Sequence, residues 1–320
     1  MSRPLIFITG ATGFIGCHVV LQSLEAGYKV RLSVRKEGQI SALRKLFSKH
    51  AANLDFVVIQ DFTNPSRFSE ALQDVTYVIH LASPMPGKGT DFKSDYLQPA
   101  AQGTIALLDA AKKIKSIKRV IVVSSVLALI PLDGLATGKF TVKEGINHTI
   151  PVDPDMAFPE DPMASGGMMY QVSKILAHRA TLDWVRTNKP SFGLVTLHPS
   201  FVFGRNLSQT STEGLDGTNA MLWGCLHSPK AFIPANGVDV RDVALAHLKA
   251  LETEAVAEGE VAEFVRAKYP ALDVKLEGPF EEPPVVITQK AETVLGMKWK
   301  SMEETVGSFL DQQLQFKAQL

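Results

Sequence analysis

A glycine-rich string directly behind the first apolar segment constrains the fold of this chain more than any other feature. Gly10, Gly13 and Gly16 follow a strand predicted over residues 5–9 and open a predicted helix, which is the context that gives a G-x-x-G-x-x-G string its meaning. Such glycines allow a tight turn and a close approach of the backbone to a pyrophosphate, while free amides at the helix start face the anion. The string predicts a dinucleotide-binding turn, and an incidental glycine-rich loop is the disfavoured alternative.

Short apolar runs alternate with longer amphipathic runs up to about residue 125. This order is typical of a parallel sheet that is covered by helices on both faces. Strands are predicted over residues 5–9, 29–34, 55–60, 77–80, 120–124 and 193–197. Between the last two strands the periodicity fades from about Ile130 to Gly167, which predicts a long excursion outside the core, and a helix is expected over residues 170–188.

The pattern becomes irregular after Ser200. Helices are expected near residues 242–251, 261–268 and 302–315. The sequence as a whole predicts an α/β fold, a Rossmann-type doubly wound parallel sheet with a smaller C-terminal substrate lobe. Residues 1–200 are expected to form the dinucleotide-binding domain, and residues 201–320 the smaller lobe, from which some of the chain returns to the Rossmann core.

Composition excludes several classes of partner. The chain has 33 Lys and Arg and 33 Asp and Glu residues, so no basic excess indicates a nucleic-acid or membrane partner. Cys17 and Cys225 lack metal-ligand spacing, and no metal site is expected. The apolar run over residues 5–8 is too short for a signal sequence or a spanning helix. With 45% hydrophobic residues and a mean hydropathy of +0.07, we expect a soluble, cytoplasmic protein, a monomer or homodimer.

The end of the second predicted strand indicates which dinucleotide is bound. An NAD-selective protein usually carries an acidic residue there, to accept hydrogen bonds from the ribose hydroxyls, but this chain has Arg35 and Lys36. A guanidinium can hold a 2′-phosphate through two hydrogen bonds, so NADP(H) is the expected cofactor; the alternative for Arg35 is a solvated surface charge. Asp61, past the third strand, either accepts from the adenine amino group or caps the helix after Asn64.

Tyr170 and Lys174 are spaced i to i+4 in a predicted helix, so their side chains lie on one face, one turn apart. A neighbouring cation favours the phenolate and is expected to bring the pKa of the phenol closer to neutral pH. Ser124 and Ser125 end the fifth predicted strand at the sheet edge where doubly wound folds bind ligands. We choose Ser125 to bond the substrate carbonyl, Tyr170 to donate the proton, and Lys174 to assist and to hold the nicotinamide ribose.

Further segments complete the pattern, at residues 8–16, 34–35, 78–84, 123–125, 170–174, 198–204, 240–247 and 295–299. They are distributed over most of the length of the chain. Together they resemble the extended short-chain dehydrogenases/reductases of the NAD(P)-dependent epimerase/dehydratase family. Within it they are similar to the dihydroflavonol 4-reductase and cinnamoyl-CoA reductase-like group, which includes fungal ketone and aldehyde reductases.

The resemblance implies that Ser125, Tyr170 and Lys174 are catalytic. It also implies a cofactor site, made of Gly10, Thr12, Gly13, Phe14, Ile15, Gly16, Arg35, Lys36, Asp61, Phe62, Leu81, Ala82, Ser83, Tyr170, Lys174, His198, Pro199 and Val202. The ring of His80 is expected to pack rather than to act as an acid or base, and that of His198 is similar.

The chain departs from that group in three places. The interval between Ser125 and Tyr170 is long and ends in a Met-rich approach at residues 163–169, an apolar run follows Ser125, and residues 258–265 indicate a shortened small lobe. None of these removes a catalytic group. Met156, Met163, Met168 and Met169 either line an adaptable apolar pocket or pack the excursion, and the pocket is slightly favoured.

We therefore expect an NADPH-dependent oxidoreductase that reduces a ketone or aldehyde, such as a secondary-metabolite intermediate, to the alcohol. One alternative is a sugar-nucleotide epimerase or dehydratase, against which Arg35 argues because relatives of that kind mostly use NAD. The other is a non-catalytic NADP-binding regulator. The joint presence of Ser125, Tyr170 and Lys174 argues against a regulator.

Overall fold

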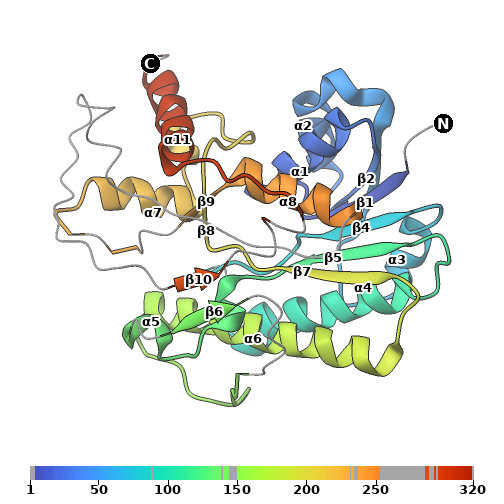
Figure 1. Cartoon of the computed structure of the whole chain (residues 1–320), viewed down its shortest axis with the longest axis horizontal. Helices are drawn as coiled ribbons and strands as arrows, with labels where there is room; N and C mark the ends of the chain where they lie inside the picture. The colour runs from blue at the N-terminus through green and yellow to red at the C-terminus, as the bar shows by residue number, and fades with distance from the viewer. Residues whose placement is uncertain are drawn as a thin grey trace.

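The protein is described from a computed structural model, which covers residues 4–87, 89–137, 140–143, 150–230, 232–233, 237–252, 285–287, 292 and 295–318. A six-stranded parallel sheet of order β3-β2-β1-β4-β5-β7 lies at its centre (Figure 1). Its strands are β1 (Leu5–Thr9), β2 (Lys29–Val34), β3 (Leu54–Val58), β4 (Tyr77–His80), β5 (Arg119–Val123) and β7 (Gly193–Leu197). The order reverses between β1 and β4, and ligands of doubly wound folds bind at that point. The expected Rossmann-type fold is confirmed.

Helices cover both faces of the sheet (Figure 1). One face carries α1 (Phe14–Glu25), α2 (Gly38–Leu46) and α8 (Val240–Glu252), and the other carries α3 (Ser66–Ala71), α4 (Gly103–Ala111) and α6 (Pro162–Asn188). Strand β1 shows why the sheet has two cores, because successive side chains of a strand point to opposite faces. Ile6 and Ile8 pack in the first core, whereas Phe7 packs in the second.

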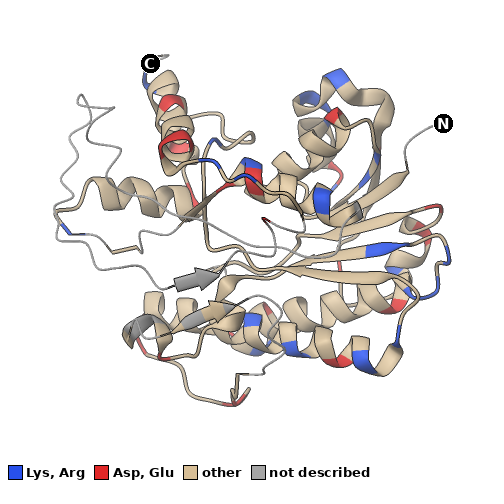
Figure 2. Ribbon diagram, viewed as in Figure 1, with Lys and Arg blue, Asp and Glu red and all other residues tan. Residues whose placement is uncertain are grey.

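The remaining elements connect the strands and helices of this core or follow β7. They are η1 (Ser48–Asn53), the π-helix η2 (Phe92–Gln102), η3 (Val126–Leu129), α5 (Gly134–Thr137), β6 (Thr141–Lys143), β8 (Phe201–Phe203), η4 (Thr212–Gly214), α7 (Gly217–Leu226), β9 (Gly237–Asp239), β10 (Val285–Ile287) and α11 (Met302–Lys317). Helices α7 and α11 contribute to a separate hydrophobic cluster. It contains Leu222 of α7, Phe309 of α11 and Phe203 of β8. Basic and acidic residues are interspersed over the helices in this view (Figure 2). The domain boundary at residue 200 stays a prediction.

The helix that carries Tyr170 begins earlier than expected. Helix α6 starts at Pro162, so the prediction of a start at Tyr170 is wrong by about two turns. The Asp161 side chain caps it by accepting from Ala164 N at 2.8 Å, and Pro162 occupies the first turn, where its missing N–H costs no bond. The excursion is correspondingly shorter and contains α5 and β6. The helix expected near residues 261–268 and the segment 258–265 lie outside the described residues.

Candidate active site

The turn after β1 has the geometry of a phosphate cradle. Gly10 has a φ of +74°, and a Cβ there would meet Ala82 N at 2.8 Å. A Cβ at Gly16 would meet the Gly10 carbonyl oxygen at 2.1 Å, so both positions exclude larger residues. Thr12 and Gly13 are exposed at the start of α1, and within the described chain no side chain caps that helix end. Its first amides are therefore available to an anion.

The cations predicted to select the cofactor lie in the turn after β2. Arg35 and Lys36 are exposed. The Gln39 side-chain oxygen accepts from their backbone amides at 2.9 and 3.1 Å, which holds the turn. Neither cation takes part in an ion pair with the residues that the structure describes. This arrangement fits a 2′-phosphate, which needs a cation that no carboxylate neutralises.

Asp61 and Phe62 follow β3. The Asp61 carboxylate accepts from the Thr63 hydroxyl at 2.7 Å and from Thr63 N at 2.8 Å. These hydrogen bonds lower the pKa of Asp61. Asp61 therefore does not cap α3, which begins at Ser66. The Phe62 ring is half-buried and lies 6.2 Å from the ring of His80.

The end of β4 is tied to β1 through Thr9. The Thr9 hydroxyl lies 2.8 Å from His80 Nδ1 and accepts from Ala82 N at 3.2 Å, while Leu81 N donates to the Thr9 carbonyl at 3.3 Å. Burial, with the Lys174 charge as a smaller contribution, lowers the pKa of His80 to about 4. The His80 ring is therefore neutral at pH 7, as a packing role requires.

Ser125 and Tyr170 come from different elements and meet at the carboxyl edge of the sheet. Ser125 follows β5 and is buried, and its hydroxyl accepts from Leu127 N at 3.2 Å. The Ser125 side chain lies near enough to the Tyr170 phenol to influence its pKa as a hydrogen-bonding group. Burial raises the pKa of Tyr170 to about 12, and Ser125 opposes this only in part. The expected lowering of this pKa by Lys174 is not seen in this structure, where burial dominates and Ser125 supplies the opposing contribution.

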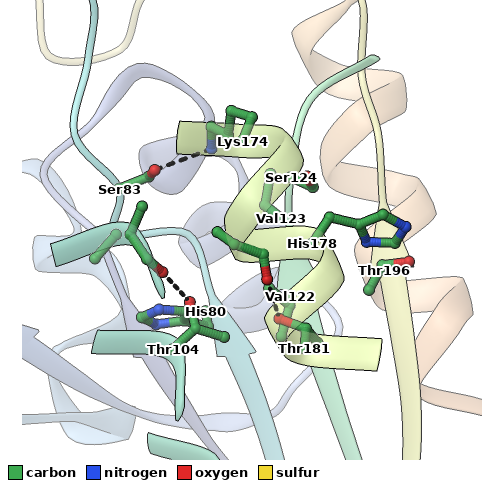
Figure 3. Close-up of a pocket in the computed structure, with 13 residues that line it drawn as sticks. His80, Ser83, Thr104, Val122, Val123, Ser124, Lys174, His178, Thr181 and Thr196 are labelled. Atoms are coloured by element: carbon green, nitrogen blue, oxygen red, sulfur yellow. Dashed lines mark hydrogen bonds between the residues drawn. The ribbon is translucent and has the colours of Figure 1, made fainter. Parts of the chain in front are cut away.

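Lys174 lies one turn after Tyr170 on α6. Its Nζ is 5.4 Å from the centroid of the Tyr170 ring and donates to the Ser83 hydroxyl at 2.9 Å (Figure 3). The side chain is buried, and burial lowers the pKa of Lys174 to about 8. The ammonium form still predominates at pH 7. Lys174 thus brings a positive charge to the site, and Ser83 helps to hold it.

Lys174 lines a cavity of about 20 Å³. That volume holds about one water molecule. Figure 3 shows side chains from β4, β5, α6 and β7 around it. Its polar lining includes His80, Ser83, Thr104, Ser124, Lys174, His178, Thr181 and Thr196. Ser124 therefore lines the cavity beside Lys174, whereas the Ser125 side chain lies near the Tyr170 phenol.

The segment after β7 closes the same edge. His198 Nδ1 lies 3.1 Å from the Ser125 carbonyl oxygen, and its Nε2 lies 3.0 Å from the Thr196 hydroxyl. The Pro199 carbonyl accepts from Val126 N at 3.0 Å. Val202 is buried in a cluster that Phe14 and Ile15 also contact, which connects this segment to the phosphate cradle. The structure thus brings the predicted residues of this segment to the site edge, with the imidazole of His198 turned toward protein groups.

The Met-rich approach divides into an exposed and a packed part. Met163 is 86% exposed, whereas Met169 is buried. Met169 packs in a cluster with Phe92 and Tyr96 of η2, and Met156 and Met168 lie against that cluster. The packing interpretation therefore holds for these three, against the slight preference for a pocket.

Sequence reasoning missed two residues, Tyr96 and Gln171, whose side chains hold loops at the site. The Tyr96 hydroxyl accepts from Gly87 N at 3.0 Å and so holds the loop after Ser83. Gln171 Nε2 donates to the Ile130 carbonyl at 3.1 Å and fixes the segment after η3. Both bonds join distant parts of the chain, and no local pattern signals them.

The described part of the chain contains neither a candidate metal site nor a candidate membrane-spanning helix. Its His, Cys, Asp and Glu residues nowhere gather into a group that could hold a metal ion. Its helices include none that is both long and apolar enough to cross a membrane.

Comparison with known proteins adds independent evidence. Residues 6–263 match the sequence profile of the NAD dependent epimerase/dehydratase family. A protein of Aspergillus fumigatus named ketoreductase sphI is 38% identical over 338 aligned residues, which cover 99% of each chain.

Solved structures show the same relationship. The structure of Gre2 from Candida albicans in complex with NADPH is similar with a TM-score of 0.80 and 28% identity, covering 98% of this chain and 99% of that one. Yeast methylglyoxal/isovaleraldehyde reductase Gre2, complexed with NADPH, is similar with a TM-score of 0.78 and 25% identity, covering 99% of this chain and 100% of that one. The similarity therefore extends over nearly the entire length of both structures.

Proposed function

This chain belongs to the NAD-dependent epimerase/dehydratase family, and we propose that it is an NADPH-dependent reductase that converts a ketone or aldehyde into the alcohol. The observation that carries the proposal is the meeting of the Ser125 hydroxyl, the Tyr170 phenol and the Lys174 ammonium beside a glycine cradle. The ketoreductase name of the Aspergillus relative and the NADPH bound by both Gre2 proteins support it.

The cofactor would be held by groups from three parts of the chain. The first amides of α1 would bind the pyrophosphate, and Arg35 would bind the 2′-phosphate. Lys174 would bond the nicotinamide ribose. NADPH supplies a hydride to the carbonyl carbon when it is bound.

The protein's own groups would act on the carbonyl oxygen. Ser125 donates a hydrogen bond to that oxygen and polarises it, while Tyr170 donates its proton to it. A phenol with a pKa near 12 keeps its proton at neutral pH, and an alkoxide is basic enough to take it. The Lys174 ammonium then stabilises the phenolate left behind. The products are the alcohol and NADP, and solvent restores the proton on Tyr170.

A panel of carbonyl compounds tests this function. We expect NADPH consumption with aldehydes, diketones, keto esters, dihydroflavonols or acyl-CoA thioesters, and slower consumption with NADH. Conversion of a sugar nucleotide without net consumption of NADPH would instead favour an epimerase. Tight NADPH binding without turnover would favour a regulator. The cytoplasmic location and the monomer or homodimer expected from the sequence stay predictions.

A further inference from the structure

The imidazole of His198 lies between the segment that carries Ser125 and the helix that carries Tyr170 and Lys174. On one side its Nδ1 is 3.1 Å from the Ser125 carbonyl oxygen. On the other side its ring packs edge to face with that of His178, at 4.6 Å between centroids and 85° between planes. His178 is one turn after Lys174 on α6. A single ring therefore contacts both elements that form the site.

Hydrogen positions on His198 follow from its partners. A carbonyl oxygen only accepts, so Nδ1 carries the hydrogen and donates it to Ser125. Nε2 is then an acceptor, and the Thr196 hydroxyl donates to it at 3.0 Å. Burial and the neighbouring His178 lower the pKa of His198 to about 3, in keeping with a neutral ring. Both nitrogens are engaged by protein groups, so the ring has no polar atom left for the cofactor or substrate.

The Ser125 peptide is held on each side by the segment that carries His198. Ser124 N donates to the Leu197 carbonyl at 2.7 Å, and Val126 N donates to the Pro199 carbonyl at 3.0 Å. The Ser125 carbonyl itself also accepts from Ala128 N at 3.0 Å, within η3. Val126 N and the Ser125 carbonyl belong to the same peptide group, so the Pro199 carbonyl holds its N–H while His198 and Ala128 N hold its C=O. The bond from Ser124 N fixes the chain one residue before Ser125. The orientation of this peptide sets the direction in which the Ser125 hydroxyl points.

We propose that His198 is a positioning residue that locks the Ser125 peptide against α6 and so keeps the Ser125 hydroxyl within reach of the Tyr170 phenol. This inference rests on the proposed carbonyl reduction and deepens it. It differs from the sequence-based expectation that His198 contacts the cofactor, because it assigns the ring to a protein carbonyl.

Two substitutions of His198 distinguish the roles of its two ring nitrogens. The amide nitrogen of asparagine lies near the position of Nδ1 in histidine, whereas the terminal group of glutamine lies near Nε2. His198→Asn therefore keeps a donor for the Ser125 carbonyl, and His198→Gln keeps only a polar group near Thr196. Thr196→Val removes the donor to Nε2 and leaves the bond to Ser125.

The experiment measures kcat, KM, the NADPH dissociation constant and the thermal midpoint for the wild type and the three variants. We expect His198→Gln to lower kcat about tenfold or more, because small misplacements of a catalytic group are costly. The NADPH dissociation constant should stay within about twofold of wild type. His198→Asn should keep kcat within about threefold, and Thr196→Val should behave like His198→Asn.

The outcomes are distinguishable. Equal losses of kcat in His198→Asn and His198→Gln, or no loss in either, would overturn the positioning role. A loss confined to NADPH affinity would assign the ring to the cofactor and also overturn it. The thermal midpoint detects a folding defect, and a loss of activity that follows the midpoint in all three variants would reduce His198 to a structural residue. A wild type that turns over no carbonyl would overturn the proposed function, and the positioning role with it.

Discussion

Lys174 Nζ donates a hydrogen bond to the Ser83 hydroxyl at 2.9 Å, which joins the middle of α6 to the loop that follows β4. Lys174 is only 5% exposed, so its ammonium has lost most of its hydration. Burial lowers its pKa to about 8, and an acceptor such as the Ser83 hydroxyl favours the charged form. The burial of Lys174 therefore determines up to which pH the site keeps its positive charge.

The first prediction concerns the pH dependence of activity. The proposed mechanism needs the Lys174 ammonium, so activity is complete below the pKa of Lys174 and falls as the pH rises through about 8. Ser83→Ala removes an acceptor that favours the ammonium, so the decline should move to lower pH. The dependence of kcat/KM on pH measures the shift, because it reports groups of the free enzyme. Ser124→Ala, at the other serine of the cavity, is the control, and an unshifted Ser83→Ala profile would contradict the assignment.

Cofactor selectivity gives the second prediction. Arg35→Ala should raise KM for NADPH by about tenfold or more and change KM for NADH little, because only NADPH carries the 2′-phosphate that a guanidinium binds through two hydrogen bonds. Lys45→Ala is a suitable control, since Lys45 is an exposed cation of α2. Equal effects of Arg35→Ala on both cofactors would show that Arg35 does not bind the phosphate.

The third prediction tests the phosphate cradle. Gly16→Ala would place a Cβ 2.1 Å from the Gly10 carbonyl oxygen, so α1 must move away from the turn. We expect loss of NADPH binding and a lower thermal midpoint. At Gly38, in the first turn of α2, nothing lies within 4 Å of an added Cβ. Gly38→Ala should leave NADPH binding intact and stabilise the protein by up to about 1 kcal/mol. Normal NADPH affinity in Gly16→Ala would refute this account of the turn.

Buried histidines predict how stability changes with pH. Burial lowers the pKa of His80 and of His247 to about 4, below the value of 6.5 for a free histidine. Between pH 4 and pH 6.5 the unfolded chain therefore binds more protons than the folded chain. The stabilisation is present above about pH 6.5 and is lost as the pH falls toward 4, by up to about 1.4 kcal/mol per pH unit for each group.

Urea unfolding over this pH range measures that slope. His247→Asn keeps a donor for the Val243 carbonyl that His247 Nδ1 contacts at 2.6 Å, but it removes the titrating ring. The slope should decrease relative to wild type. His227→Asn, at an exposed position, is the matched control. An unchanged slope in His247→Asn would count against burial as the origin of the effect.

Local patterns were sufficient for the elements of the proposed cofactor site. The strand over residues 5–9, the glycines behind it and the cations after β2 each lie in a short stretch of sequence, so strand and helix periodicity places them. The i to i+4 spacing likewise placed Tyr170 and Lys174 on one helix face. Asp161 as the capping residue and Pro162 in the first turn also indicated the start of α6. The other Pro and Gly residues nearby made that start difficult to recognise.

The rest depends on contacts between distant segments. The pKa of Tyr170 is set by how deeply its phenol is buried, and spacing alone indicates only which charge is near. The orientation of the His198 ring depends on the Ser125 carbonyl and on His178, each brought by a different element. A short motif identifies such a residue as near the site, but it does not determine what the side chain contacts.

The rate of hydride transfer in a single turnover of Tyr170→Phe tests the central claim most directly. Excess protein with bound NADPH is mixed with a carbonyl compound that the wild type reduces, and the loss of NADPH is followed in time. Phenylalanine preserves the packing of the ring but has no proton to donate, so we predict a rate about a hundredfold or more below wild type with unchanged NADPH affinity. A Tyr170→Phe protein that reduces the carbonyl at the wild-type rate would contradict the assignment of Tyr170 as proton donor.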